Sequence, residues 1–380
     1  MNSTDTSKKR LDYLDIAKGI GMVLVLMGHL QGDAIFSLSP VFHPICVFIF
    51  SFHMPMFFII SGILINHTYN EDISLKDHAK KRFKFIMIPY FCFSVCYLSV
   101  VVYALIKGSI MPETLFVNLT YVISLYGMNV LWFLPALFLG ELLFLALKKK
   151  LSSKVLPIVI IVLNVFGFAL SKYVNTLSNE IPLYKKVSVI FTVLTRPLLV
   201  CGFIAIGYAV HEFVKNNKKF KAIEESIESS IVKSRIIYIL LGLILLGVCA
   251  FFSKVNNGID FRSLKFGNIF FFFLCALSGS YGLILFCKGL PKIRLLSFWG
   301  KGSLIFMAVH NSETVLFYAL KASMYANKFL THARGYICYA IILGIILIYT
   351  SVMILLIENC FPFILGKGLP KFIKSKNSSK

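Results

Sequence analysis

Residues 18–33 read KGIGMVLVLMGHLQGD, an apolar run that opens on Lys18 and holds His29 eleven positions later. A membrane-spanning helix needs about 20 largely apolar residues, and the stretch 13–31 meets that requirement. Ionisable side chains inside such a helix are rare and usually functional, because their burial in hydrocarbon is costly. The stretch therefore predicts a first membrane span that also carries chemistry.

The composition places the whole chain in the membrane class. Of its 380 residues 58% are hydrophobic, 15% are charged and 37 are Phe, and the mean hydropathy is +0.81. A soluble domain needs a polar shell, whereas lipid can solvate this much apolar surface. We predict an all-α polytopic membrane bundle of about ten transmembrane helices. The candidate spans are approximately 13–31, 45–65, 85–106, 130–147, 155–172, 188–212, 235–252, 268–287, 302–321 and 336–358.

Two further segments have patterns of their own. The stretch 112–127 is apolar but short and punctuated, so we expect it to lie at the membrane interface or to re-enter the bilayer. The longest polar segment, KNNKKFKAIEESIESSIVKS, predicts a short surface helix. No soluble domain can be separated, so we predict one membrane domain over 1–380 with short cytoplasmic tails at about 1–12 and 366–380.

The charge pattern predicts orientation. The net charge is +22, from 39 Lys and Arg against 17 Asp and Glu. Most of the basic residues fall in alternate segments that share a side with the N-terminus: 8–10, 76–84, 148–154, 215–235, 288–301 and 367–380. The positive-inside rule then places both termini in the cytoplasm, which requires an even number of spans. Because this charge lies in short loops and not on one face, it does not indicate nucleic-acid binding.

The cysteines and the N-terminus give simpler predictions. The nine Cys lie almost entirely in apolar runs and form no C-x-x-C pair, so we interpret them as buried small hydrophobes and expect no metal site. A basic region precedes the first apolar run, but no small-residue cleavage site follows it. We therefore expect a retained helix instead of a cleaved signal peptide.

The first span brings three ionisable groups to one side. Eleven residues of α-helix make three turns plus roughly 20°, so Lys18 and His29 share a face about 16 Å apart along the axis. Asp15 lies three residues before Lys18 on the same side. The alternative is that Lys18 reaches the cytoplasmic headgroups while His29 reaches the opposite interface.

Two later spans contain polar residues at depth. His53 precedes Pro55 in SFHMPMFFIISG, and a proline loosens the helix beside it, which favours a lined cavity. In SLIFMAVHNSET, His310 and Glu313 are three residues apart and share a face. The alternatives are a histidine bonded to a proline-freed carbonyl at His53, and helix–helix hydrogen bonds around His310.

A basic cluster precedes the third span. Lys81, Arg82 and Lys84 lie in KKRFKFIMIPYF at the predicted cytoplasmic entry. Such a cluster attracts the phosphates of an anionic cofactor or of lipids. The alternative is that these residues only orient the helix in the membrane.

The segments LDYLDIAKGIGMVLVLMGH, FSFHMPMFFIISGILI, KKRFKFIMIPYF, LWFLPALF and GKGSLIFMAVH occur in this order. This succession of motifs resembles that of the acyltransferase-3 family of integral membrane acyltransferases, and more closely that of its fucose 4-O-acetyltransferase-like branch. The likeness extends over nearly the whole chain, with the specific motifs mainly in the first ninety residues. The family's basic-x10-His spacing is matched by Lys18 and His29, with Lys where many members have Arg.

The resemblance implies an enzyme that moves an acyl group, usually acetyl, from cytoplasmic acyl-CoA to a sugar hydroxyl of an envelope or exported polysaccharide, in the bacterial plasma membrane. The acceptor is then a polysaccharide or lipid-linked sugar, membrane lipids are partners, and no metal is expected. On this hypothesis, the catalytic residues are His29, His53 and Lys18, the CoA phosphates bind Arg82, Lys84 and Lys81, and the acceptor contacts His310, Glu313, Trp132 and Asp15.

Two other functions remain open at this stage. Buried His, Lys and Glu in about ten spans also suit a proton-coupled exporter of a polysaccharide or its lipid-linked precursor. Paired inverted halves are typical of a transporter, and no second copy of KGIG…GH or FHMP is present, which favours the enzyme. A non-catalytic membrane subunit is the third class, and it would not require Lys18 and His29 on one face.

Overall fold

The computed structural model describes residues 11–32, 42–69, 72–180, 184–311, 315, 319 and 334–368. Apart from one isolated β-bridge, Asp260–Lys265, the regular structure of these residues is helical. The elements are α1 (Asp12–Gly32), α2 (Phe42–Thr68), α3 (Leu75–Arg82), the π-helix η1 (Phe83–Met87), α4 (Ile88–Ile106), α5 (Pro112–Ile123), the 3₁₀-helix η2 (Asn129–Trp132), α6 (Phe133–Lys150), α7 (Val155–Glu180), α8 (Tyr184–Asn216), α9 (Lys218–Glu228), α10 (Ile231–Ser253), α11 (Ile269–Gly289), α12 (Arg294–Lys301), α13 (Ser303–Val309), α15 (Arg334–Cys360) and the 3₁₀-helix η3 (Pro362–Leu365).

Nine helical segments of the described chain are long and apolar enough to cross a membrane. This confirms the predicted all-α polytopic bundle. The surfaces of these segments carry large apolar side chains, such as Ile106, Ile158 and Phe270, that are more than half exposed. Lipid contact accounts for that exposure, because hydrocarbon is a good solvent for such side chains.

The candidate span 302–321 differs from the other predicted spans. Gly302 separates α12 from α13, and α13 ends at Val309. Most of the C-terminal part of that candidate, including Glu313, lies outside the described residues. The stretch 112–127 forms α5, whose 12 residues extend only about 18 Å and cannot cross the roughly 30 Å hydrocarbon core.

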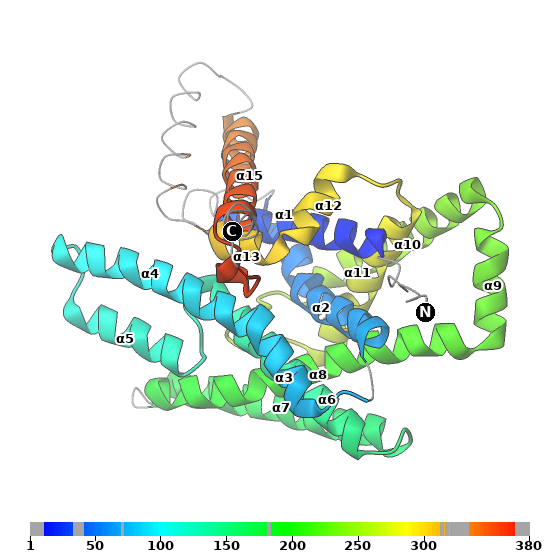
Figure 1. The fold of residues 1–380 in the computed structure, drawn as a ribbon, viewed down its shortest axis with the longest axis horizontal. Helices are drawn as coiled ribbons and strands as arrows, with labels where there is room; N and C mark the ends of the chain where they lie inside the picture. Colours follow the sequence, from blue (N-terminus) through cyan, green and yellow to red (C-terminus); the bar gives the residue numbers. More distant parts are fainter. Residues whose placement is uncertain are drawn as a thin grey trace, which may run out of the picture.

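Ion pairs gather several loops at one end of the bundle. Lys288 bonds Glu224 at 2.5 Å and Glu228 at 2.9 Å, which fixes α9 to the end of α11. Lys292 pairs with Asp12 at the start of α1 at 2.7 Å. Figure 1 shows α9 across the ends of α8 and α10, opposite the hairpin of α4 and α5. The predicted surface helix is thus present, at the end that the charge pattern assigns to the cytoplasm.

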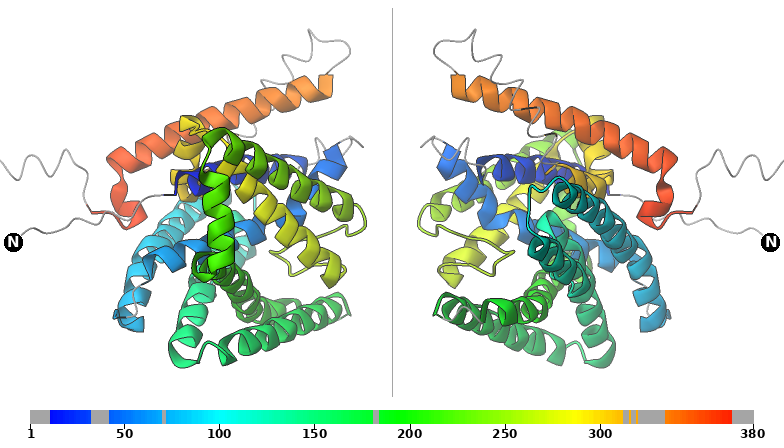
Figure 2. Two further views of the ribbon diagram at one scale, coloured as in Figure 1. Left: turned by 90° about the vertical axis from the view of Figure 1, so that its right-hand side faces the viewer. Right: turned by 90° about the vertical axis from the view of Figure 1, so that its left-hand side faces the viewer.

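Close helix crossings build the centre of the bundle. A Cβ atom on Gly62 of α2 would meet the carbonyl oxygen of Ile204, and one on Gly207 of α8 would meet that of Ile59. Small residues let membrane helices approach in this way and gain packing energy that lipid cannot supply. Figure 2 shows α15 and α7 on opposite sides of the bundle, with α1, α2 and α11 between them.

Two hydrophobic clusters meet along α1. The first half of this helix, including Leu14 and Ala17, packs in a cluster with α2, α8 and α11. The second half, including Leu26 and Leu30, packs with α4, α13 and α15. Asp15 and Lys18 thus lie on the part of α1 that packs in the first cluster, and His29 lies on the part that packs in the second.

Candidate functional site

Three histidines from three helices gather inside the bundle. His29 lies on the last turn of α1, His53 lies within α2, and His310 directly follows α13. The centroids of the His29 and His310 rings are 5.2 Å apart. Phe50 lies 6.5 Å from His29 and 5.1 Å from His53, so this phenylalanine links the two rings. His29 and His310 are 24 and 257 residues from His53 in the chain, so only the folded bundle brings the three rings together.

Hydrogen bonds assign the proton in two of the rings. Nδ1 of His310 lies 2.8 Å from the carbonyl oxygen of Met307 and 3.1 Å from that of Phe306. Nδ1 of His53 lies 2.9 Å from the carbonyl oxygen of Ile49. A carbonyl oxygen only accepts, so each Nδ1 carries the proton, and each neutral ring keeps its lone pair on Nε2.

The Nε2 atom of His310 is the most informative single atom of the cluster. His310 is 3% exposed, and its Nε2 has no hydrogen-bond partner among the described residues. Most buried polar atoms are paired, because an unpaired one loses its hydration without compensation. A substrate hydroxyl is the kind of donor that such a lone pair accepts.

Tyrosine and asparagine side chains position this corner of the bundle. The Tyr97 hydroxyl donates to the carbonyl oxygen of Ala308 at 3.0 Å, and Asn311 donates from Nδ2 to Oδ1 of Asn129 at 2.9 Å. The Tyr339 hydroxyl donates to the carbonyl oxygen of Met27 at 3.3 Å, which connects α15 to α1. These bonds connect α4 to α13, the end of α13 to η2, and α15 to α1, so five elements are tied together in two groups around the His29–His310 pair.

Arg196 connects the two loops that flank Trp132. This fully buried guanidinium donates from Nη1 to the carbonyl oxygen of Tyr126 at 2.7 Å and from Nη2 to that of Arg262 at 2.6 Å. It also lies 5.0 Å from the centroid of the Trp132 ring, which stacks on Phe261 at 6.0 Å. The predicted acceptor residue Trp132 therefore belongs to a braced loop assembly.

The loop that Arg196 braces carries two charged residues in the vicinity of His29. Asp260 and Arg262, on the loop between α10 and α11, lie close enough to His29 for electrostatic interaction. The Asp260 carboxylate accepts a hydrogen bond from the Arg262 amide at 2.9 Å, which fixes the turn. Nothing in the sequence pattern of this polar loop indicated that its charges lie near His29.

The other end of α1 carries an ion pair. The Lys18 amine lies 2.9 Å from an Asp15 carboxylate oxygen, and Asp15 is almost fully buried. A Cβ on Gly300 of α12 would meet the Asp15 carbonyl oxygen, so α12 presses on this turn. Lys18 and His29 lie on one continuous helix, which places them roughly 16 Å apart along its axis.

The basic cluster is tied to α6 through a buried carboxylate. Arg82, at the end of α3, donates from Nε to Oε2 of Glu141 at 2.5 Å and from Nη2 to Oε1. The Ser61 hydroxyl donates to the same Glu141, which is fully buried. Lys81 and Lys84 are exposed on either side of Arg82. A π-helix follows immediately, and such segments recur at functional sites.

The comparison with protein families settles the class of protein. The acyltransferase-3 family model, described as an acyltransferase domain, matches residues 11–356. The chain belongs to the acyltransferase-3 family. It is therefore a membrane acyltransferase, as the motif order predicted. No match was found among curated proteins or solved structures.

The acyltransferase brings its predicted residues together in three places. His29 and His310 are in ring contact, and His53 is one phenylalanine away. Lys18 and Asp15 form a pair, and Arg82 lies between the exposed Lys81 and Lys84. Glu313 lies outside the described residues. The assignment of catalytic, CoA and acceptor roles to these groups stays a prediction.

Two residues of the acyltransferase gain partners that the sequence analysis did not assign. Glu141 and Arg196 are ionisable groups within apolar spans, a signal that marks functional or structural importance. Their partners are contributed by segments about 60 to 70 residues away in the chain, so spacing within one helix could not reveal them. Within the described residues, no group of three His, Cys, Asp or Glu side chains is arranged to hold a metal ion.

Proposed function

We propose that this acyltransferase moves an acetyl, or similarly short acyl, group from cytoplasmic acyl-CoA to a hydroxyl of a sugar in an envelope or exported polysaccharide or its lipid-linked form. The observation that carries the proposal is the cluster of three histidines inside the bundle, at the opposite end of α1 from Lys18 and Asp15. A bacterial plasma membrane is the setting that this substrate pair implies.

The donor enters from the basic end of the bundle. Lys81, Arg82 and Lys84 offer charge-assisted hydrogen bonds to the CoA phosphates. Arg82 keeps its pairing with Glu141 and is 36% exposed at its side chain, so part of the guanidinium faces solvent. The thioester arm then extends along α1 past Lys18 toward His29, a distance of roughly 16 Å along the helix.

The transfer itself is a general-base reaction. A nitrogen of His29 takes the proton of the acceptor hydroxyl as the oxygen attacks the thioester carbonyl. The new C–O bond forms, the C–S bond breaks, and the CoA thiolate takes the proton from the His29 imidazolium. His310 accepts a hydrogen bond from the acceptor at its Nε2, while His53 and Trp132 line the acceptor side and Asp15 orients Lys18. Transient acylation of His29 is the alternative route within the same site.

A His29→Ala variant tests the assignment directly. Purified enzyme in nanodiscs, given labelled acetyl-CoA and a sugar acceptor, is expected to lose transfer by a factor on the order of 10²–10⁴, the usual contribution of a general base. Donor binding to the variant remains, because His29 is remote from the phosphates. Full acyl transfer by His29→Ala would contradict the role given to this residue.

Analysis of surface glycans separates the enzyme from an exporter. Cells that lack the protein are expected to retain glycan export and lose O-acyl groups, measured by chemical release of acetate from purified glycan. Lost export with normal acylation would instead support the proton-coupled exporter. Variants at His29 report on the same readout within the living cell.

A further inference from the structure

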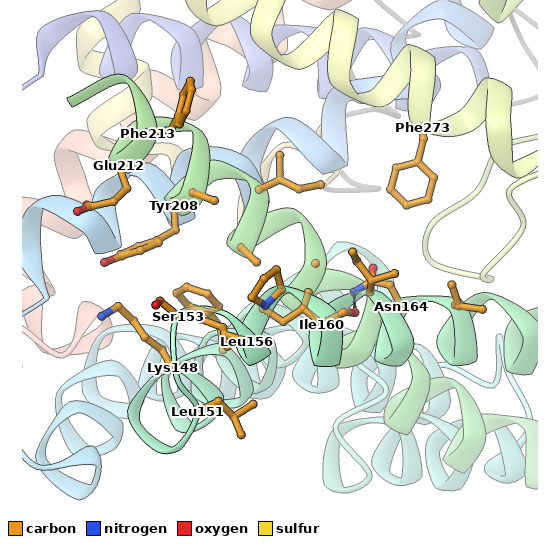
Figure 3. A pocket seen from close by; sticks show the side chains of 18 of the residues that line it. Lys148, Leu151, Ser153, Leu156, Ile160, Asn164, Tyr208, Glu212, Phe213 and Phe273 are labelled. Atoms are coloured by element: carbon orange, nitrogen blue, oxygen red, sulfur yellow. Dashed lines mark hydrogen bonds between the residues drawn. The ribbon is translucent and has the colours of Figure 1, made fainter. Parts of the chain in front are cut away.

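A large groove lies between α6, α7 and α8, apart from the histidine cluster. Its volume is 1330 Å³, above the roughly 300–1,000 Å³ of ordinary small-molecule pockets. Leu156, Ile160 and Phe168 of α7 and Ala205 of α8 contribute to its apolar walls. Figure 3 shows these walls between the two helices, with Asn164 and Phe273 at one end. A groove of this size and lining suits hydrocarbon chains.

The opposite end of the groove has two opposite charges. Figure 3 shows Lys148, Tyr208 and Glu212 together there. The Lys148 amine lies 5.3 Å from the centroid of the Tyr208 ring and 4.8 Å from that of Tyr69. This end adjoins the basic segment 148–154, on the predicted cytoplasmic side. The polar end thus lies at the depth of cytoplasmic lipid headgroups.

Amide side chains hold the carboxylate of Glu212 in place. Asn66 of α2 donates to Oε2 of Glu212. Asn216, one turn after Glu212 on α8, donates to Oε1 at 2.6 Å. A carboxylate has about four lone-pair sites, so two donors leave capacity for a further cation or N–H group. An anchored carboxylate beside a lysine forms a dipolar site.

The groove is separate from the proposed reaction path. Gly207 turns the other face of α8 toward Ile59 of α2, the helix that carries His53. His29, His53 and His310 are not among the residues that line the groove. The occupant is therefore not placed for acyl transfer.

We propose that this groove binds a two-chain phospholipid of the cytoplasmic leaflet whose headgroup is a phosphate bearing a primary ammonium, as in phosphatidylethanolamine. Lys148 bonds the phosphate, the ammonium donates to Glu212, and the acyl chains lie on the apolar walls. Glu212 disfavours a purely anionic headgroup by like-charge repulsion. A quaternary choline has no N–H to donate to the carboxylate, so it forfeits that hydrogen bond.

Native mass spectrometry of the delipidated full-length protein tests this binding. The protein is titrated with phosphatidylethanolamine, phosphatidylcholine and phosphatidylglycerol of identical chains. We expect tighter binding of phosphatidylethanolamine by about tenfold, the change that corresponds to one charge-assisted hydrogen bond. Equal binding of the three lipids would overturn the proposal and identify the occupant as unselective bulk lipid.

Three variants locate the site. Glu212→Gln is expected to abolish the preference for phosphatidylethanolamine over phosphatidylcholine. Lys148→Met is expected to weaken the binding of all three lipids. Ala209→Trp fills the groove from an exposed position without a clash in the core, so it blocks binding even if Glu212→Gln fails to fold. Lys150→Met is the matched control, because Lys150 is exposed and does not line the groove. Unchanged binding by both Lys148→Met and Ala209→Trp would reject the groove as the binding site.

Discussion

At the scale of the residue, the decisive feature is a buried acceptor nitrogen on a histidine ring that lies against a second histidine. His310 uses its only N–H on backbone carbonyl oxygens of its own helix turn, which leaves Nε2 without a hydrogen-bond partner among the described residues. The sequence pattern identified His310 because a polar run inside an apolar span is unusual. The tautomer, and the contact with His29, required the fold, because α13 and α1 are distant in the chain.

His310→Phe is expected to lower kcat for acyl transfer by about 10²-fold while the KM for acyl-CoA stays unchanged. The phenyl ring keeps the packing volume but removes the acceptor atom, so the sugar hydroxyl loses its orienting bond. Steady-state kinetics in nanodiscs measure both constants. His310→Gln restores an acceptor and is expected to recover part of the rate. An equal loss for both variants, with lowered thermal stability, would indicate a structural role instead.

The structural role of the Arg82–Glu141 pair can be separated from the donor-binding role proposed for Arg82. Glu141→Ala leaves a guanidinium without its buried partner and is expected to destabilise the protein by about 3 kcal/mol. Replacing both residues by Met removes the uncompensated charge, so the double variant is expected to recover most of the thermal stability. The double variant is still expected to bind acyl-CoA more weakly than the wild type, because the proposed phosphate contact of Arg82 is absent.

Two measurements distinguish these roles. Thermal unfolding in nanodiscs reports the stability, and competition with CoA reports donor binding. Lys107→Met, at the opposite end of α4, is the charge-matched control and is expected to change neither. Normal CoA affinity in the double variant would remove Arg82 from the donor site and leave it a purely structural residue.

At the scale of the element, the long helices were predictable and the short ones only in part. Apolar runs of about 20 residues dictate spans because backbone polar groups in lipid must bond within their own helix. Helix α12 was not predicted, because its eight residues fall in the basic segment 288–301 that precedes the candidate span 302–321. The end of α13 at Val309 was not predicted, because that candidate span continues to 321. The short apolar run 112–127 could be told from a span, since proline and glycine bound it, but the sequence analysis did not predict that it forms the helix α5.

Glycine substitutions test the α2–α8 crossing that positions His53. Gly62→Ala places a Cβ against the carbonyl oxygen of Ile204, so the helices must separate, and we expect lower stability by about 1–3 kcal/mol. Gly247→Ala on α10 meets no neighbouring atom and is expected to stabilise, by up to about 1 kcal/mol, through helix propensity. Thermal unfolding of the two variants should therefore shift in opposite directions. Shifts of the same sign would show that the crossing does not govern stability.

At the scale of the whole molecule, the basic segments and the histidine cluster lie toward opposite ends of α1. The basic segments, α9 and the start of α1 lie at one end, while the histidine cluster lies toward the other end of α1. A donor that is made in the cytoplasm can reach His29 only if the basic end faces the cytoplasm. The net charge alone could not establish this arrangement, because the arrangement depends on which side of the bundle each loop lies.

Epitope insertion tests this orientation. A tag inserted after Gly108, in the turn between α4 and α5 where no atom lies within 4 Å of an added Cβ, is expected to bind antibody on sealed spheroplasts. A tag inserted after Ser229, at the turn between α9 and α10, is expected to bind only after permeabilisation. Retained acyltransferase activity in both insertions serves as the control for folding. The reverse pattern would place Lys81, Arg82 and Lys84 outside the cell, away from any CoA pool, and the donor route along α1 would have to be abandoned even if the histidine cluster proved essential.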